Sequence, residues 1–203
     1  FLWSVMNPEH ERRAAEILRK HLPDVPVLCS CDVVPEIREW ERISATVLSA
    51  YILPRIRGYL GELETLLAGE GYDRGALIMQ INGGCASVPE IFKRPVNILA
   101  SGPAAAPAAA RFYARSRGIR DIVAIDMGGT SLDVTLVRDG RAALSRDVKV
   151  EQQPIGVPAV DVLSIGAGGG SIAWGGSGGA PRNRPARARG RPGPGPLGPG
   201  GAG

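Results

Sequence analysis

The N-terminal third of the chain has the hydrophobic spacing of helices. Asn7 and Pro8, followed by acidic residues, are typical of a helix start, and this helix is expected to run to His21. Residues 25–33 are expected to be a short extended stretch. From residue 37 to residue 67, apolar residues recur every three or four positions, which predicts an amphipathic helical region bent or interrupted at Pro54.

The middle of the chain alternates strand and helix patterns. Short apolar or extended runs, several of them ending at glycine, predict strands. These strands cover residues 76–81, 95–99, 119–125, 134–137 and 160–165. Asp139 and Gly140 predict a tight hairpin, and residues 104–118 predict an alanine-rich helix. The alternation indicates an α/β fold.

After Trp174 the composition changes to glycine, proline, alanine and arginine. No apolar period survives there, so residues 175–203 are expected to form a disordered tail. The formal net charge of +4 becomes −1 once the five arginines of this tail are set aside, so the body shows no nucleic-acid footprint. Nucleic-acid binding by the tail remains an alternative, although the tail lacks aromatic residues that would stack on bases.

Bulk composition indicates a globular protein. Apolar residues make up 44% of the 203 positions, enough for a substantial core. The alanine-rich stretch is too short to span a bilayer, and the N-terminal residues do not resemble a signal peptide, so a cytoplasmic chain without a membrane partner is expected. Three cysteines do not suit a disulfide framework. Cys29 and Cys31 could share a soft metal, or they are small, partly buried residues in a reducing compartment.

The strongest chemical signal is the octapeptide D-M-G-G-T-S-L-D at residues 126–133. A strand would bring Asp126 to the end of a sheet, where two glycines allow the backbone to turn and approach an anion. Backbone amides and the Thr130 and Ser131 hydroxyls can donate hydrogen bonds to phosphate oxygens. Asp126 and Asp133 would be repelled by phosphate, but they suit Mg²⁺ or a bridging water. The alternative is a glycine-rich turn with solvated acids.

A second glycine cluster follows the apolar run at residues 160–165. Adjacent glycines cost backbone entropy, so the close approach of a ligand or of another backbone would explain them. The cluster is neither a P-loop nor a dinucleotide fingerprint, because the required lysine and glycine spacing are missing. Its candidate phosphate-binding residues are Gly166, Gly168, Gly169, Gly170 and Ser171.

Two further turns are weaker candidates for site loops. They are Asn82-Gly83-Gly84 and Ser101-Gly102. Taken alone, each is more typical of a structural turn. A serine–histidine–aspartate triad is not expected, because both histidines, His10 and His21, precede every candidate nucleophile loop.

Seven motifs in order resemble the hydantoinase A/5-oxoprolinase family, within the actin-like ATPase superfamily. The resemblance covers residues 1 to about 174. Its motifs are N-P-E-H-E at 7–11, V-V-P-E-I-R-E-W-E-R at 33–42, T-V-L-S-A-Y at 46–51, I-M-Q-I-N-G-G at 78–84, L-A-S-G-P-A at 99–104, D-M-G-G-T-S-L-D-V at 126–134 and V-D-V-L-S-I-G-A-G-G-G-S-I-A-W at 160–174.

The resemblance implies an incomplete actin-like domain with a mixed sheet and flanking helices. It also implies an enzyme that uses ATP and Mg²⁺ to phosphorylate a carbonyl oxygen. The substrate would be a cyclic amide of the hydantoin or 5-oxoproline type, with a ketone carboxylase as the alternative, and a hydantoinase B-type subunit or domain as partner. Asp126 and Asp133 would be the catalytic and metal-binding residues. The phosphate loop would comprise Gly128, Gly129, Thr130 and Ser131.

The chain departs from the family pattern in several places, the first being Ala105-Ala106-Pro107 where family members often have two glycines after S-G-P-A. The superfamily has another D-x-G-G-T near its N-terminus as a first phosphate clamp, and this sequence lacks it. The chain is therefore expected to be an internal fragment that is inactive in isolation, and a non-catalytic actin-like nucleotide-binding scaffold stays as an alternative. After Trp174, a one-base shift in one possible coding sequence restores the family's G-A-D-P-G-P-A, which suggests a frameshift.

Overall fold

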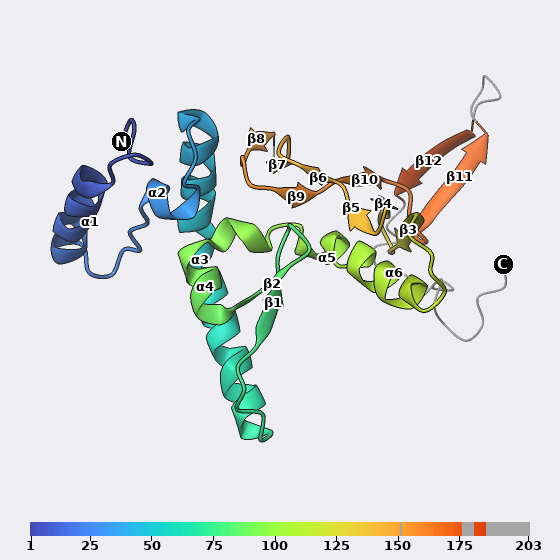
Figure 1. Cartoon of the computed structure of the whole chain (residues 1–203), viewed down its shortest axis with the longest axis horizontal. Coiled ribbons are helices and arrows are strands. Elements are labelled where there is room, and N and C mark those ends of the chain that lie inside the picture. The colour runs from blue at the N-terminus through green and yellow to red at the C-terminus, as the bar shows by residue number, and fades with distance from the viewer. Residues whose placement is uncertain (151, 176–180, 186–203) are drawn as a thin grey trace. The chain divides into compact units, whose positions relative to one another are not determined.

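The computed structural model describes residues 1–150, 152–175 and 181–185, and it combines helices with short sheets (Figure 1). The chain forms two compact units. Unit 1 comprises Phe1–Ala105 and Leu144–Val160, and unit 2 comprises Ala106–Ala143 and Asp161–Gly203. This mixture confirms the α/β class. Within the described residues, no helix is long and apolar enough to cross a membrane.

Unit 1 begins with three helices, α1 (Glu9–His21), α2 (Ser30–Val33) and α3 (Glu39–Gly69). The start of α1 is confirmed: Asn7 Oδ1 accepts a hydrogen bond from the Glu9 N–H at 3.1 Å. The extended stretch predicted for residues 25–33 is wrong at its end, because its last four residues form α2. Cys29 and Cys31 pack there against Ala15 of α1, and this local packing favours a helical turn.

Helix α3 continues through Pro54 as one unbroken helix. Proline removes one backbone hydrogen bond from a helix interior. The neighbouring Leu53, Ile56 and Leu60 are all buried, and Ile56 and Leu60 pack against Val88 and Ile91. This tertiary packing offsets the cost of the lost hydrogen bond. The interruption predicted as one possibility at Pro54 does not occur.

The rest of unit 1 consists of short elements around α3. β1 (Leu77–Met79) and β2 (Cys85–Ser87) form an antiparallel pair, followed by α4 (Val88–Lys93) and α5 (Ser101–Ala104). The strand predicted at 95–99 is wrong, because Pro95–Ile98 is a 3₁₀ helix, η1, with Pro95 and Val96 buried. Residues from the second segment add β6 (Leu144–Ser145) paired with β9 (Ala159–Val160), and β7 (Lys149–Val150) paired with β8 (Gln153–Pro154).

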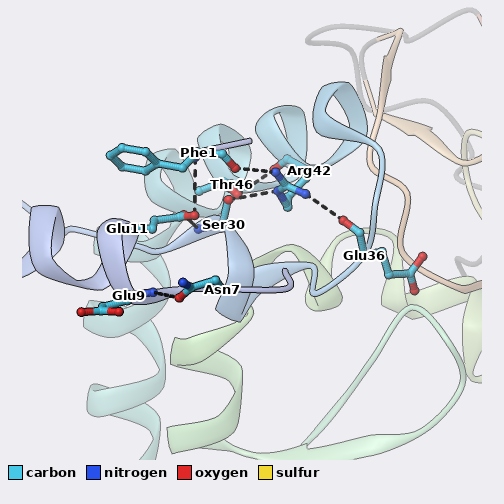
Figure 2. A network of polar contacts seen from close by, with 8 residues as sticks. All are labelled: Phe1, Asn7, Glu9, Glu11, Ser30, Glu36, Arg42 and Thr46. Carbon is cyan, nitrogen blue, oxygen red and sulfur yellow. Dashed lines mark hydrogen bonds and ion pairs between the residues drawn. The ribbon is translucent and has the colours of Figure 1, made fainter. Parts of the chain in front are cut away.

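A buried arginine ties the N-terminal part of unit 1 together (Figure 2). Arg42 of α3 is only 2% exposed. Its guanidinium donates hydrogen bonds to Ser30 Oγ at 3.1 Å, to the Glu36 carbonyl oxygen at 2.9 Å and to the Phe1 carbonyl oxygen at 2.8 Å. The Ser30 N–H in turn donates to the Glu11 carboxylate. Each of the three guanidinium nitrogens therefore has a hydrogen-bond acceptor, which offsets part of the cost of burying the charge.

Unit 2 contains helix α6 (Ala106–Arg115) and an antiparallel sheet. The sheet has the order β10–β4–β3, with β5 also paired to β4. Its strands are β3 (Ile122–Met127), β4 (Leu132–Arg138), β5 (Arg141–Ala142) and β10 (Val162–Ile165). The Asp139-Gly140 hairpin is confirmed, with both residues at positive φ. Every strand pair within the described residues is antiparallel, so the predicted mixed sheet is not seen there; the turn between β3 and β4 is too short for a parallel crossover.

The two faces of this sheet differ sharply. Thr135 and Val137 point to the face that α6 contacts and are 2% and 3% exposed. The alternate residues point to the other face. They include Ile125 and Leu163, which are 65% and 64% exposed.

Part of the predicted disordered tail has regular structure. β11 (Ser171–Gly175) pairs antiparallel with β12 (Pro181–Pro185). The expectation of disorder is therefore wrong for residues 181–185. Their prolines lie at the strand ends, where the missing N–H is least costly, and backbone pairing needs no apolar pattern. Residues 176–180 and 186–203 of that tail lie outside the described residues, and the frameshift stays a prediction for sequencing of the gene.

Candidate functional site

The octapeptide at residues 126–133 forms the turn between β3 and β4 and the strand ends beside it. The Gly128 N–H donates to the Ser131 carbonyl oxygen at 2.9 Å, which closes the turn. Asp126 pairs directly with Asp133 in the strand register. Side chains that are opposite each other lie on the same face of a sheet. The fold therefore brings the two predicted carboxylates together at one end of the sheet.

The second glycine cluster packs onto the first. The Gly169 N–H donates to the Gly128 carbonyl oxygen, and the Gly170 N–H donates to the Gly129 carbonyl oxygen, both at 2.9 Å. Within the cluster, the Gly168 N–H donates to Ser171 Oγ at 3.0 Å, and the Ser171 N–H donates to the Gly168 carbonyl oxygen. We call residues 128–131 together with 166–171 the double glycine loop. The two clusters form one structure.

Two glycines of the second cluster are required by this packing. A β-carbon on Gly168 would lie 2.6 Å from the Gly128 oxygen and 2.6 Å from the Thr130 nitrogen. A β-carbon on Gly170 would lie 2.9 Å from the Gly129 oxygen. Backbone atoms cannot move away as a flexible side chain can. Of the two explanations for adjacent glycines, the approach of another backbone therefore applies at Gly168 and Gly170.

Donors remain open on the first cluster. Within the described residues, the N–H groups of Gly129 and Thr130 donate no hydrogen bond, whereas those of Gly169 and Gly170 are used between the loops. Gly129 and Thr130 are exposed, and Ser131 is half-buried. Successive open N–H groups and hydroxyls at a turn make an anion-binding concavity. The second cluster supports the first by backbone hydrogen bonds, and phosphate binding by the first stays a prediction.

The Asp126–Asp133 pair is suited to a cation. Opposed side chains on neighbouring strands have β-carbons about 5 Å apart, and like charges placed there repel. Mg²⁺ typically takes one or two protein carboxylates and completes its shell with water and phosphate oxygens. No group of three or more metal-ligating side chains occurs in the part of the chain that the structure describes. Two carboxylates on one face of the sheet fit a Mg²⁺ that takes its other ligands from water and phosphate.

Ser164 of β10 extends this row, because it pairs with Asp133 on the other side of β4. No motif or spacing in the sequence singles out Ser164. Only the strand order β10–β4–β3 puts a hydroxyl next to the carboxylate pair. The alternation of polar and apolar residues in 162–165 predicts which sheet face Ser164 shares. It does not predict that β10 lies next to β4, with Ser164 beside Asp133.

Comparison with known proteins fixes the family. The family model described as Hydantoinase/oxoprolinase matches residues 42–202. The chain belongs to the hydantoinase/oxoprolinase family. The matched range continues past Trp174, where the motif resemblance was expected to end, so this family member retains similarity in its glycine-, proline- and arginine-rich segment.

The relatives of this hydantoinase/oxoprolinase chain are much longer. It is 43% identical over 173 residues to caprolactamase subunit alpha of Pseudomonas jessenii, covering 85% of this chain and 25% of that subunit. It is 37% identical over 180 residues to the acetophenone carboxylase gamma subunit of Aromatoleum aromaticum, covering 85% and 24%. The crystal structure of ATP-dependent caprolactamase from Pseudomonas jessenii matches with a TM-score of 0.80 and 42% identity, over 96% of this chain and 28% of that one. The chain spans about a quarter of each relative.

The remaining predicted loops of this family member lie in unit 1. Asn82 Oδ1 accepts a hydrogen bond from the Gly84 N–H at 2.9 Å, and Gly83 has a φ of +79°. A β-carbon on Gly83 would lie 3.3 Å from the carbonyl oxygen of Ala104, which closes the short helix begun by Ser101 and Gly102. These two loops therefore pack together. Their part in a site with the double glycine loop stays a prediction.

Burial lowers the reactivity of Cys29 and Cys31. Cys29 and Cys31 are buried, and burial raises the pKa of both thiols, that of Cys31 to about 11. Both thiols are therefore neutral at pH 7 and are poor nucleophiles. All three cysteines are free.

Proposed function

We propose that this chain supplies phosphate-binding loops of an ATP-dependent enzyme that opens a cyclic amide by phosphorylating its carbonyl oxygen. The observation that carries the proposal is the double glycine loop, in which the Gly129 and Thr130 N–H groups have no hydrogen-bond acceptor among the described residues and follow the Asp126–Asp133 pair in the turn. The lactam-opening relatives, among them proteins named 5-oxoprolinase, supply the substrate class.

In this proposal, the loop residues bind phosphate and the two aspartates bind the metal. The N–H groups of Gly129 and Thr130 and the hydroxyls of Thr130 and Ser131 hold phosphate oxygens. Asp126 and Asp133 hold Mg²⁺, directly or through water, and so offset charge on the phosphates. When bound, ATP would supply the phosphoryl group: the amide oxygen would receive it as ADP leaves, and attack by water would then open the ring and release inorganic phosphate. Gly168 and Gly170 keep the first loop in place from behind.

Ketone carboxylation is a second candidate. It is supported by the acetophenone carboxylase relative and by a solved structure of acetone carboxylase with a TM-score of 0.72 at 28% identity. Both reactions place phosphate on a carbonyl-derived oxygen, so the same loops serve either one. We further propose an actin-like domain, a hydantoinase B-type partner subunit, and a cytoplasmic setting, which the three free cysteines support. The non-catalytic nucleotide-binding scaffold remains the third alternative.

A chimera tests the catalytic proposal. Residues 1–174 would replace the matching segment of caprolactamase subunit alpha in the assembled enzyme, and caprolactam-dependent ATP hydrolysis would be measured. We expect hydrolysis that Asp126→Asn lowers at least 100-fold, while Asp161→Asn, an exposed carboxylate of the same unit, changes it less than twofold. Hydrolysis indifferent to Asp126 would refute the assigned roles. The 203-residue chain alone should turn over ATP negligibly, because it holds one of the two clamps that the family resemblance implies.

A further inference from the structure

A basic and aromatic groove lies in unit 2, away from the double glycine loop. Its volume is about 520 Å³. The lining comes from α6, from the segment before β3 and from the hairpin glycine, Gly140. The basic and large apolar residues of its lining are Arg111, Phe112, Arg115, Ile119 and Arg120.

The apolar part of the groove is exposed. Phe112 is 76% exposed and Ile119 is half exposed. Tyr113 lies next to Phe112 on α6, with ring centroids 5.5 Å apart in an edge-on arrangement, and it is also exposed. Pro107 is buried and Ala110 and Ala114 are half-buried, and their i, i+3, i+7 spacing places them together on the side of α6 that packs on the sheet. Exposed aromatic side chains grouped with arginines are typical of protein interfaces.

The charged part of the groove is unbalanced. Within the described residues, Arg111 and Arg115 form no ion pair, and the i, i+4 spacing puts them on one side of α6. Arg120 has an exposed ion pair with Asp139 at 3.6 Å, which contributes little and can be exchanged. Asp121 accepts a hydrogen bond from the Asp139 N–H at 2.8 Å. Arg111 and Arg115 therefore lie beside Phe112 and Ile119 without a carboxylate partner among the described residues, and carboxylates of a ligand would complement them.

The groove and the double glycine loop lie at opposite ends of the β3–β4 hairpin. The Gly140 N–H donates to the Arg120 carbonyl oxygen at 2.8 Å, beside the start of β3. The six residues of β3 then span about 20 Å to the turn at Gly128. A partner bound in the groove would leave the open N–H groups of Gly129 and Thr130 accessible.

We propose that this groove docks an acidic segment of a partner protein, with an apolar side chain against Phe112 and Ile119 and carboxylates on Arg111 and Arg115. A short groove with a single apolar floor suits a peptide segment. A nucleic acid requires a longer basic track with several stacking rings, which these residues do not provide. The proposal is independent of the phosphate chemistry at the other end of the sheet.

Fluorescence anisotropy tests the docking site on the 203-residue chain. The probe is a labelled ten-residue peptide of alternating glutamate and leucine, compared with its glutamine counterpart and with a labelled oligothymidine. We expect the acidic peptide to bind at least tenfold more tightly than the glutamine peptide, with a loss of at least tenfold on Arg111→Glu and on Phe112→Ser. The matched control is Arg55→Glu, an exposed arginine of unit 1 that lies outside the groove, which should change binding less than twofold.

Circular dichroism of each variant separates loss of docking from loss of folding, and Arg111→Gln provides a milder second variant. The proposal is overturned if both peptides bind alike, if Arg55→Glu weakens binding as much as Arg111→Glu, or if the oligothymidine binds more tightly than the acidic peptide. Self-association that Phe112→Ser abolishes would identify a second copy as the occupant and would also overturn it.

Discussion

The two units stabilise their loops by different means. In unit 1, the loops rest on buried aliphatic side chains and on the Arg42 network, with Val33, Ala45, Ile81 and Val96 in one cluster. In unit 2, backbone hydrogen bonds join one loop to the other, and large apolar side chains on one sheet face are exposed. Unit 1 is thus fixed by packing, whereas the proposed chemistry of unit 2 depends on backbone geometry that a single β-carbon would disturb.

The largest effect is expected from Gly168→Ala. Its β-carbon would lie 2.6 Å from two backbone atoms of the first loop, so the loops must separate. We expect a cost of about 3 kcal/mol to the paired loops. Hydrogen exchange of the Gly169 and Gly170 amides should accelerate more than tenfold.

Gly166→Ala is the matched control. A β-carbon at Gly166 meets nothing within 4 Å, so both amides should keep their protection. Equal acceleration in the two variants would show that the loops are not locked at Gly168.

A comparable loss, confined to unit 1, is expected from Arg42→Met. The change leaves the carbonyl oxygens of Glu36 and Phe1 and the Ser30 hydroxyl without their donor (Figure 2). We expect the free energy of unfolding of unit 1 to fall by about 3 kcal/mol in urea titrations followed by circular dichroism. Arg55→Met, on the exposed side of α3, should stay within about 0.5 kcal/mol of the original chain. A fall of the same size in both would mean that the network contributes nothing specific.

A smaller, pH-dependent effect is expected at Glu11. Burial opposes its ionisation, but hydrogen bonds to the carboxylate, including those from Ser30, outweigh burial and lower its pKa. A lowered pKa in the folded state gives stability that is present above the unfolded value of about 4.3 and is lost as the pH falls through the folded value. Glu11→Gln should remove about 1 kcal/mol at pH 7 and less at pH 3, measured by urea titration at both pH values. A loss that grows toward acid pH would contradict this account.

Elements that depend on local preferences could be predicted from the sequence, whereas contacts that depend on strand order could not. The helix-start residues predicted α1, periodicity predicted α3, and the Asp-Gly signal predicted the β4–β5 hairpin, because these depend on local preferences. The octapeptide and the glycine cluster were both found as motifs. Their hydrogen bonds to each other, and the position of Ser164 beside Asp133, depend on strand order, which spacing along the chain does not encode. The predicted strand at 95–99 failed because burial of Pro95 and Val96 selects a 3₁₀ turn.

The most direct test of the central claim is the effect of Asp126→Asn on stability and on nucleotide binding in the same chain. Without ligand, the substitution relieves the repulsion opposite Asp133 and should raise the free energy of unfolding by roughly 0.5 kcal/mol. With ATP, the part of binding that depends on Mg²⁺, measured by calorimetry with and without the metal, should disappear. Asp161→Asn should change neither. A variant that is less stable and still binds ATP with the original Mg²⁺ dependence would contradict a phosphate and metal site at the double glycine loop.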